Sequence, residues 1–160
     1  MAVPWQRWTC KMPACLFDTN IWLAAVFPSH PCHGQATSAL RKATAQAPAV
    51  FCRSTQQSFL RLVTTPALQA AFGAQGLTNS DAWVALDALL ALPQVHTRDE
   101  PPGLMPLWRS LAQRDTASPK IWMDAYLAAF AIASGTGLAT LDRDFRQFEV
   151  RGLTLDLLAV

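Results

Sequence analysis

Charged residues are scarce in this chain, at 15% of its 160 residues, and neither sign dominates them. The chain has 13 basic and 11 acidic side chains, a net charge of +2, and 51% hydrophobic residues. A chain with so little charge and so much apolar surface buries a core, which excludes the class of disordered proteins. The weak positive balance allows contact with nucleic acid but does not predict it.

Segments that would anchor or cross-link the chain are also missing. No apolar run approaches the roughly 20 residues that are needed to cross a bilayer. Prolines and basic side chains interrupt the first residues, which therefore lack the apolar centre of a signal peptide. The four cysteines show no CxxC spacing, which indicates reduced thiols instead of a disulfide framework. We therefore expect a soluble, cytoplasmic protein with no membrane partner.

Three common catalytic patterns are absent as well. The chain contains neither the GxxxxGK[ST] loop of NTPases nor the GxSxG elbow of serine hydrolases. A phosphatase of the haloacid-dehalogenase type needs a second acid two residues after the Asp that follows its first strand. After Asp18 that position holds Asn20, which argues strongly against this class.

Short apolar runs alternate with helical patterns along the whole chain. The runs predict five strands, at residues 14–17, 49–52, 94–97, 137–141 and 153–158. This order predicts the α/β class: one domain with a central, mostly parallel sheet of about five strands, flanked by helices on both faces. We expect this domain to span residues 14–160, after an N-terminal extension of residues 1–13.

Cap residues predict where the helices between these strands begin and end. A helix over residues 33–47 ends before Pro48, another is capped by Ser54 or Thr55, and a third by Asn79 or Ser80. The clearest predicted helix is "SPKIWMDAYLAAFAIASG". Its residue types predict Ser118 as its cap, Pro119 at its first position and Gly135 as its stop.

Acidic residues stand where two of the predicted strands end. Asp18 follows the first strand directly, Asp142 follows the fourth, and Asp124 lies in the helix that leads into the fourth strand. Ligands of parallel sheets bind outside the carboxyl ends of the strands, so we expect these three acids to meet there. Each acid also has a simpler explanation, because negative charge is favoured at helix caps and in first turns.

Convergence of three carboxylates would carry a chemical consequence. The carboxylates would repel one another unless a cation neutralised them. Mg²⁺ prefers such oxygen ligands, and Mn²⁺ suits the same octahedral setting. A bound divalent ion orients a phosphate, acidifies a water molecule and neutralises the negative charge that develops on the leaving oxygen. The pattern therefore predicts metal-dependent hydrolysis of phosphodiester bonds.

Three stretches of the chain, "LFDTNIWL", "TQQSFLRLVTTPAL" and "MDAYLAAFAIASGTGLATLDRDF", carry a family resemblance. Together they resemble the PIN-domain ribonucleases and, within them, the VapC-like toxins of bacterial toxin–antitoxin pairs. The likeness covers roughly residues 14–158. It implies a Mg²⁺-dependent endoribonuclease with Asp18, Asp124 and Asp142 as catalytic and metal-binding residues and Asp144 as a supporting acid. It also implies an RNA substrate, a cognate antitoxin that blocks the site, and a homodimer.

One position departs from the family pattern. Many relatives carry glutamate in the middle motif where this chain has Gln56. An amide oxygen still accepts a hydrogen bond but adds no negative charge. We expect Gln56 to support an active site. The alternative is a catalytically weak or inactive PIN-fold module that binds RNA or an antitoxin without cleavage.

Other polar residues of the motifs each have two explanations. Thr19 and Asn20 either position Asp18 or a phosphate, or serve only as helix caps. Thr140 either orients the acid that follows it or simply suits a strand. Arg61 either binds an RNA phosphate or pairs with a neighbouring acid. Arg143 either binds an RNA phosphate or is simply solvated.

Overall fold

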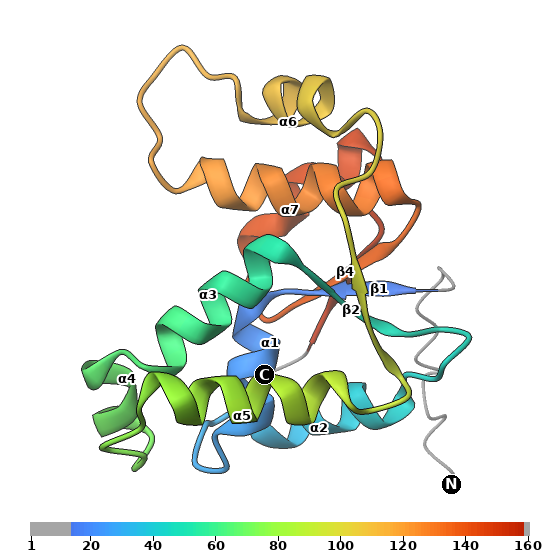
Figure 1. Cartoon of the computed structure of the whole chain (residues 1–160). Helices are drawn as coiled ribbons and strands as arrows, with labels where there is room; N and C mark the ends of the chain where they lie inside the picture. The colour runs from blue at the N-terminus through green and yellow to red at the C-terminus, as the bar shows by residue number, and fades with distance from the viewer. Residues whose placement is uncertain (1–13, 159–160) are drawn as a thin grey trace, which may run out of the picture.

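The fold is that of a computed structural model in which residues 14–158 are described, so the expected extension, residues 1–13, lies outside the described residues. The chain alternates between strands and helices (Figure 1). The strands are β1 (Cys15–Phe17), β2 (Ala49–Cys52), β3 (Val95–Arg98), β4 (Gly137–Thr140) and β5 (Leu155–Leu157). The helices are α1 (Thr19–Val26), α2 (His33–Lys42), α3 (Arg53–Val63), α4 (Pro66–Ala71), α5 (Asn79–Leu90), α6 (Leu104–Ala112), α7 (Ile121–Ser134) and the 3₁₀-helix η1 (Arg143–Arg151).

The five strands form one sheet in the order β3-β2-β1-β4-β5, and each neighbouring pair is parallel. The predicted α/β class and five-stranded sheet are therefore confirmed. The chain first builds the sheet outward from β1 through β2 to β3, and then returns to the other side of β1 with β4. The neighbours β1 and β4 are thus the point where the strand order reverses, and ligands of open parallel sheets bind at such points.

Helices cover both faces of the sheet, so its central strands β2, β1 and β4 are buried along their whole length. Along β1, Cys15 and Phe17 face one apolar cluster and Leu16 faces the other. The first cluster is closed by α1, α2, α3 and α5, and the second by α6, α7 and η1. Figure 1 shows α6 and α7 above the sheet and α1, α2 and α5 below it.

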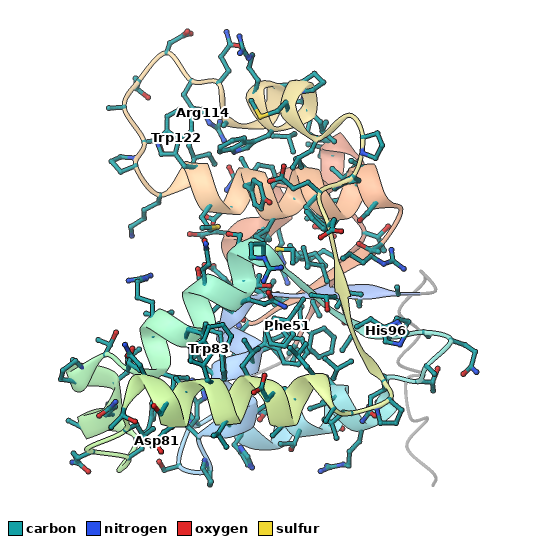
Figure 2. The ribbon with its side chains drawn as sticks, in the orientation of Figure 1. Phe51, Asp81, Trp83, His96, Arg114 and Trp122 are labelled. Carbon is teal, nitrogen blue, oxygen red and sulfur yellow. The ribbon has the colours of Figure 1, made fainter. Side chains whose placement is uncertain are left out.

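An aromatic stack fixes α1 to the sheet. Trp22 is fully buried and stacks on Phe51 of β2, with ring centroids 3.8 Å apart and an interplanar angle of 10°. Its indole Nε1 donates a hydrogen bond of 3.0 Å to the carbonyl oxygen of Phe17. Phe51 lies between the strands and α5 in Figure 2. Because α1 is held at both contacts, the residues at its amino end are held against the end of β1.

Several helix ends differ from the prediction. α2 ends at Lys42 instead of near residue 47, because Ala43 is extended and the backbone of Thr44 and Ala47 closes a turn before Pro48. The short helix α4 was not predicted, although it begins with Pro66, a residue favoured at a first helical position.

The predicted N-caps were also wrong at three helices. α3 begins at Arg53, where Cys52 is the cap and the Thr55 hydroxyl accepts from the Cys52 N–H at 3.0 Å. α5 is capped by Thr78, which exchanges hydrogen bonds with Asp81. α7 begins only at Ile121, because the residues after Ser118 form a turn.

The predicted stop of α7 is confirmed. Gly135 has a φ of +65°, a left-handed conformation that a residue without Cβ adopts at little cost. Of the helices formed by residues 14–158, none is both long and apolar enough to pass through a membrane.

Asp156, on the edge strand β5, carries a charge that the fold disfavours. Burial raises its pKa from 3.8 to about 6, and the positive charge of Lys42 offsets this only in part. The folded chain therefore binds this proton more tightly than the unfolded chain, so the stability that Asp156 gives at low pH is lost as the pH rises through 6. Asp156→Asn should raise the free energy of unfolding by about 1 kcal/mol at neutral pH, less than the full shift because a half-buried charge is screened.

Urea unfolding over a pH series measures this difference. The gain from Asp156→Asn should shrink below pH 6 and vanish below about pH 4, where the wild-type carboxyl is neutral in both states. Asp87→Asn, at an exposed position of α5, is the matched control and should show no such pH-dependent gain. An equal gain at all pH values would contradict the assignment.

Candidate functional site

The site lies at the carboxyl ends of β1 and β4. Phe17 pairs with Ala139 in the sheet, and the next N–H along β1, that of Asp18, donates to the Ala139 carbonyl at 2.9 Å. Asp18 is therefore level with Thr140, and Asp142 follows two residues later. Two acids that are far apart in the sequence thus lie at the same edge of the sheet.

The hydroxyl group of Thr140 connects these two strand ends. Thr140 is fully buried, and its Oγ1 donates to Asp18 Oδ2 at 2.6 Å. The same oxygen accepts hydrogen bonds from Asn20 Nδ2 at 3.1 Å and from the backbone N–H of Asp142 at 3.0 Å. A hydroxyl has one donor and two acceptor sites, so every hydrogen-bonding site of the Thr140 hydroxyl is occupied. It fixes the Asp18 carboxylate relative to the backbone of Asp142.

Asn20 and Asp144 complete this hydrogen-bonded set. Asn20 Oδ1 accepts from the Leu141 N–H at 3.2 Å, so its amide joins α1 to the end of β4 through both of its polar atoms. The N–H of Asp144 donates to Asp142 Oδ1 at 2.8 Å, which makes Asp142 the N-cap of η1. Thr19 is buried at the first position of α1, where its backbone N–H favours the charged form of Asp18.

Asp124, in the first turn of α7, belongs to the same electrostatic group. Burial first, and then the negative charges of Asp142, Asp18 and Asp144, together raise its pKa to about 6 against the attraction of Lys120. Burial also raises the pKa of Asp18, with a contribution from Asp142, although the Thr140 hydrogen bond opposes the shift. The fold therefore holds Asp18, Asp142 and Asp144 close enough to Asp124 to disfavour its charged form.

The donor set suits a hydrated divalent cation better than a closed metal cage. Among residues 14–158, no three His, Cys, Asp or Glu side chains are grouped tightly enough to hold an ion directly. Mg²⁺ usually keeps several water ligands and takes one or two protein carboxylates, so a looser group of acids satisfies it. Carboxylates that repel one another gain most from such a cation, and the residues present therefore fit it.

Gln56 makes a contact that the sequence did not predict. Its side chain is only 4% exposed, and its Oε1 accepts a hydrogen bond of 2.6 Å from Nη1 of Arg53. Both residues lie in the first turns of α3, directly after β2. Arg53 was not among the predicted site residues; the only signal for it was its place after the second strand.

The two predicted arginines lie in different places. Arg143 is exposed at the first position of η1, beside Asp142. Arg61 lies in the last turn of α3, eight residues and about 12 Å beyond Arg53 along the helix axis. It lines a surface pocket with Trp83 of α5, so the structure does not bring Arg61 to the acids.

The role of the Thr140 hydroxyl is testable through stability. Thr140→Val keeps the side-chain shape but leaves the Asp142 N–H and the Asn20 amide without an acceptor. We expect the free energy of unfolding to fall by about 2 kcal/mol, measured by urea unfolding in EDTA so that no ion contributes. Thr140→Ser, which keeps the hydroxyl, is the matched control. Equal stability of the valine and serine variants would contradict this role.

Comparisons of the sequence with known proteins identify one family model and two similar ribonucleases. The family model described as PIN domain matches residues 15–150. Ribonuclease VapC41 of Mycobacterium tuberculosis (strain H37Rv) is 44% identical over 145 residues, which cover 90% of this chain and 98% of that protein. Ribonuclease VapC31 of the same strain is 31% identical over 134 residues, which cover 83% of this chain and 92% of that protein.

Two solved structures share the fold. One is the crystal structure of VapBC2 from Rickettsia felis bound to a DNA fragment from their promoter, with a TM-score of 0.65, 16% identity, and coverage of 91% of this chain and 99% of that chain. The other is VapC20 of Mycobacterium tuberculosis, a Sarcin-Ricin loop cleaving toxin, with a TM-score of 0.58, 18% identity, and coverage of 87% and 95%.

The two structural matches show only a shared fold, whereas the sequence matches also show the family. They cover nearly the whole chain and include a ribonuclease that is 44% identical to it. Ribonucleases of this family are typically metal-dependent. The chain therefore belongs to the PIN-domain family and, within it, to the VapC ribonucleases, the toxins of toxin–antitoxin systems.

Proposed function

We propose that this ribonuclease is a Mg²⁺-dependent endonuclease that cleaves internal phosphodiester bonds of RNA in the cytoplasm, as the toxin of a toxin–antitoxin pair. The observation that carries the proposal is the hydrogen-bonded set around Thr140, which fixes Asp18 beside Asp142. The raised pKa of Asp124 also supports the proposal, because the charges of Asp18 and Asp142 contribute to it.

Asp18, Asp124 and Asp142 are the residues that would hold Mg²⁺, or Mn²⁺ in its place. When bound, the ion would polarise the phosphate and acidify a water molecule. The remaining residues position these acids. Thr140 and Asn20 set the orientation of the Asp18 carboxylate, and the Asp144 N–H holds one oxygen of Asp142. Because these hydrogen bonds exist before substrate binds, the acids need little rearrangement.

Gln56 bears on the alternative of an inactive module. Its amide oxygen is bound to Arg53 at 2.6 Å, so in this arrangement it serves a cation instead of the acidic group. Replacement of a glutamate by Gln56 therefore removes no carboxylate from the set formed by Asp18, Asp124 and Asp142. This supports an active enzyme over a module that binds RNA or an antitoxin without cleavage.

The cleavage proposal predicts a sharp loss in one conservative variant. Asp142→Asn keeps the side-chain shape and the cap of η1 but removes a charge, so RNA cleavage in Mg²⁺ should fall by at least about a hundredfold. Expression of the wild type should arrest bacterial growth, coexpressed antitoxin should relieve the arrest, and the variant should not arrest growth. The measurement is cleavage of total cellular RNA, followed on gels.

A stability control separates loss of chemistry from loss of fold. Asp142→Asn should unfold at or above the wild-type temperature in EDTA, because it removes a charge that raises the pKa values of two neighbouring acids. Mg²⁺ should raise the unfolding temperature of the wild type more than that of the variant. Full cleavage by a folded Asp142→Asn variant would rule out the proposed metal role, and no cleavage by a wild type that binds Mg²⁺ would favour the inactive module.

We also propose a homodimer as the form that carries the site. Two large apolar side chains are exposed at one end of the molecule: Met105 of α6 is 56% exposed and Trp122 of α7 is 59% exposed. Both line a hollow of about 680 Å³ between α6, the following loop and the start of α7. Figure 2 shows Trp122 and Arg114 at this end of the molecule. Apolar patches of this kind mark protein interfaces.

The dimer proposal predicts a change in mass. The purified chain should have twice the monomer mass of 17.5 kDa by light scattering, and Trp122→Asp should shift it toward the monomer, because a carboxylate in an apolar interface is costly. Trp83→Asp, at a similarly exposed tryptophan of α5, is the matched control and should remain dimeric. A monomeric wild type would contradict the proposal.

A further inference from the structure

Arg53 stands at the rim of the acidic site. It is the first residue of α3 and follows β2, which pairs with β1 so that Leu16 lies opposite Val50. Because β1 and β2 are parallel, Arg53 directly after β2 and Asp18 directly after β1 lie at the same edge of the sheet. The hydroxyl of the next residue, Ser54, lies 3.1 Å from the sulfur of Met123, the residue before Asp124.

The guanidinium of Arg53 is held but not neutralised. Its Nη1 donates to the Oε1 of buried Gln56 at 2.6 Å, whereas Arg53 itself is exposed. Within residues 14–158 this is the one hydrogen bond that the guanidinium makes, and no carboxylate there forms an ion pair with it. Four of its five N–H donors therefore remain for a ligand.

Helix stability does not explain this cation. The amino end of a helix carries the positive end of the macrodipole, which disfavours arginine, and the first turn of α3 contains no acid to compensate it. Arg53 is also not among the charges that set the pKa values of Asp18 and Asp124. Its charge is therefore not committed to offsetting these two acids.

The identity of residue 56 matters for this charge. A glutamate at the position would form an ion pair with Arg53 and cancel its charge. The neutral amide of Gln56 instead restricts the guanidinium while leaving its charge intact. Arginine binds phosphate oxygens with two parallel N–H groups, and a guanidinium that is already oriented loses less entropy when it binds.

We propose that Arg53, oriented by Gln56, binds a phosphate of single-stranded RNA adjacent to the one that is cleaved. The inference rests on the proposed ribonuclease function and adds a substrate-binding residue to it. Gln56 is then a positioning residue that acts through Arg53.

Binding of RNA in the absence of cleavage tests this assignment. The probe is a short, fluorescein-labelled, single-stranded RNA of mixed sequence, titrated with the full chain in EDTA and followed by anisotropy over a salt series. Arg53→Gln should bind about tenfold more weakly at low salt, and the slope of log affinity against log salt should fall by about 0.7, the value for one phosphate contact. Arg53→Lys should keep the slope but only part of the affinity.

Two further variants test the role of Gln56. Gln56→Met keeps the volume but removes the acceptor, so RNA binding should weaken less than in Arg53→Gln, because the charge remains and only its orientation is lost. The double variant Arg53→Gln/Gln56→Met should bind RNA no more weakly than Arg53→Gln alone. Additive losses would overturn the role of Gln56 as a residue that acts through Arg53.

The control is Arg41→Gln. Arg41 is exposed in the last turn of α2, which leads toward the amino end of β2 and thus to the opposite edge of the sheet. The Arg41→Gln variant should bind RNA like the wild type. Thermal unfolding first shows that Arg53→Gln is folded. If Arg53→Gln then loses no more RNA affinity than Arg41→Gln, the proposal is overturned. Because these measurements need no cleavage, they decide the role of Arg53 separately from the ribonuclease proposal.

Discussion

The hydrogen bond from Thr140 to Asp18 joins two strand ends that are separated by 122 residues in the sequence, and the acidic site depends on it. The bond forms because β4 returns to the open side of β1 after β2 and β3 have filled the other side. One hydroxyl then donates to Asp18 and accepts from Asn20 and from the backbone N–H of Asp142. The reversal of strand order is thus both a topological feature and the reason that the acids share one place.

This arrangement opposes stability, and the core offsets it. Burial and mutual repulsion raise the pKa values of Asp18 and Asp124, so their charged forms weaken the fold when no cation is present. The apolar layers on both faces of the sheet, which include the stack of Trp22 on Phe51, hold the acids in place. A site that its own fold disfavours is typical of function, since a residue chosen only for stability would not be charged there.

Charge balance links the site to its substrate. RNA is an anion and the site is acidic, so binding requires cations at particular points, because a net charge of only +2 provides no general attraction. A divalent ion among the acids would supply one such point. Arg53, held by Gln56 on the rim, and Arg143, beside Asp142, would supply others. The neutral residue at position 56 fits this balance, since a carboxylate would remove one of the few available cations.

The sequence by itself determined the order of strands and helices and hence the α/β class, because apolar periodicity and residues such as Gly135 act within a few neighbouring positions. It also placed Asp18 and Asp142 at strand ends, since a parallel sheet brings such ends to one edge. Only the tertiary structure decided which atoms meet: Thr140 with Asp18, and Arg53 with Gln56, whose contact depends on the path of α3 after β2. Helix starts at Arg53 and Ile121 also escaped prediction, because several adjacent residues could cap each helix and packing selected among them.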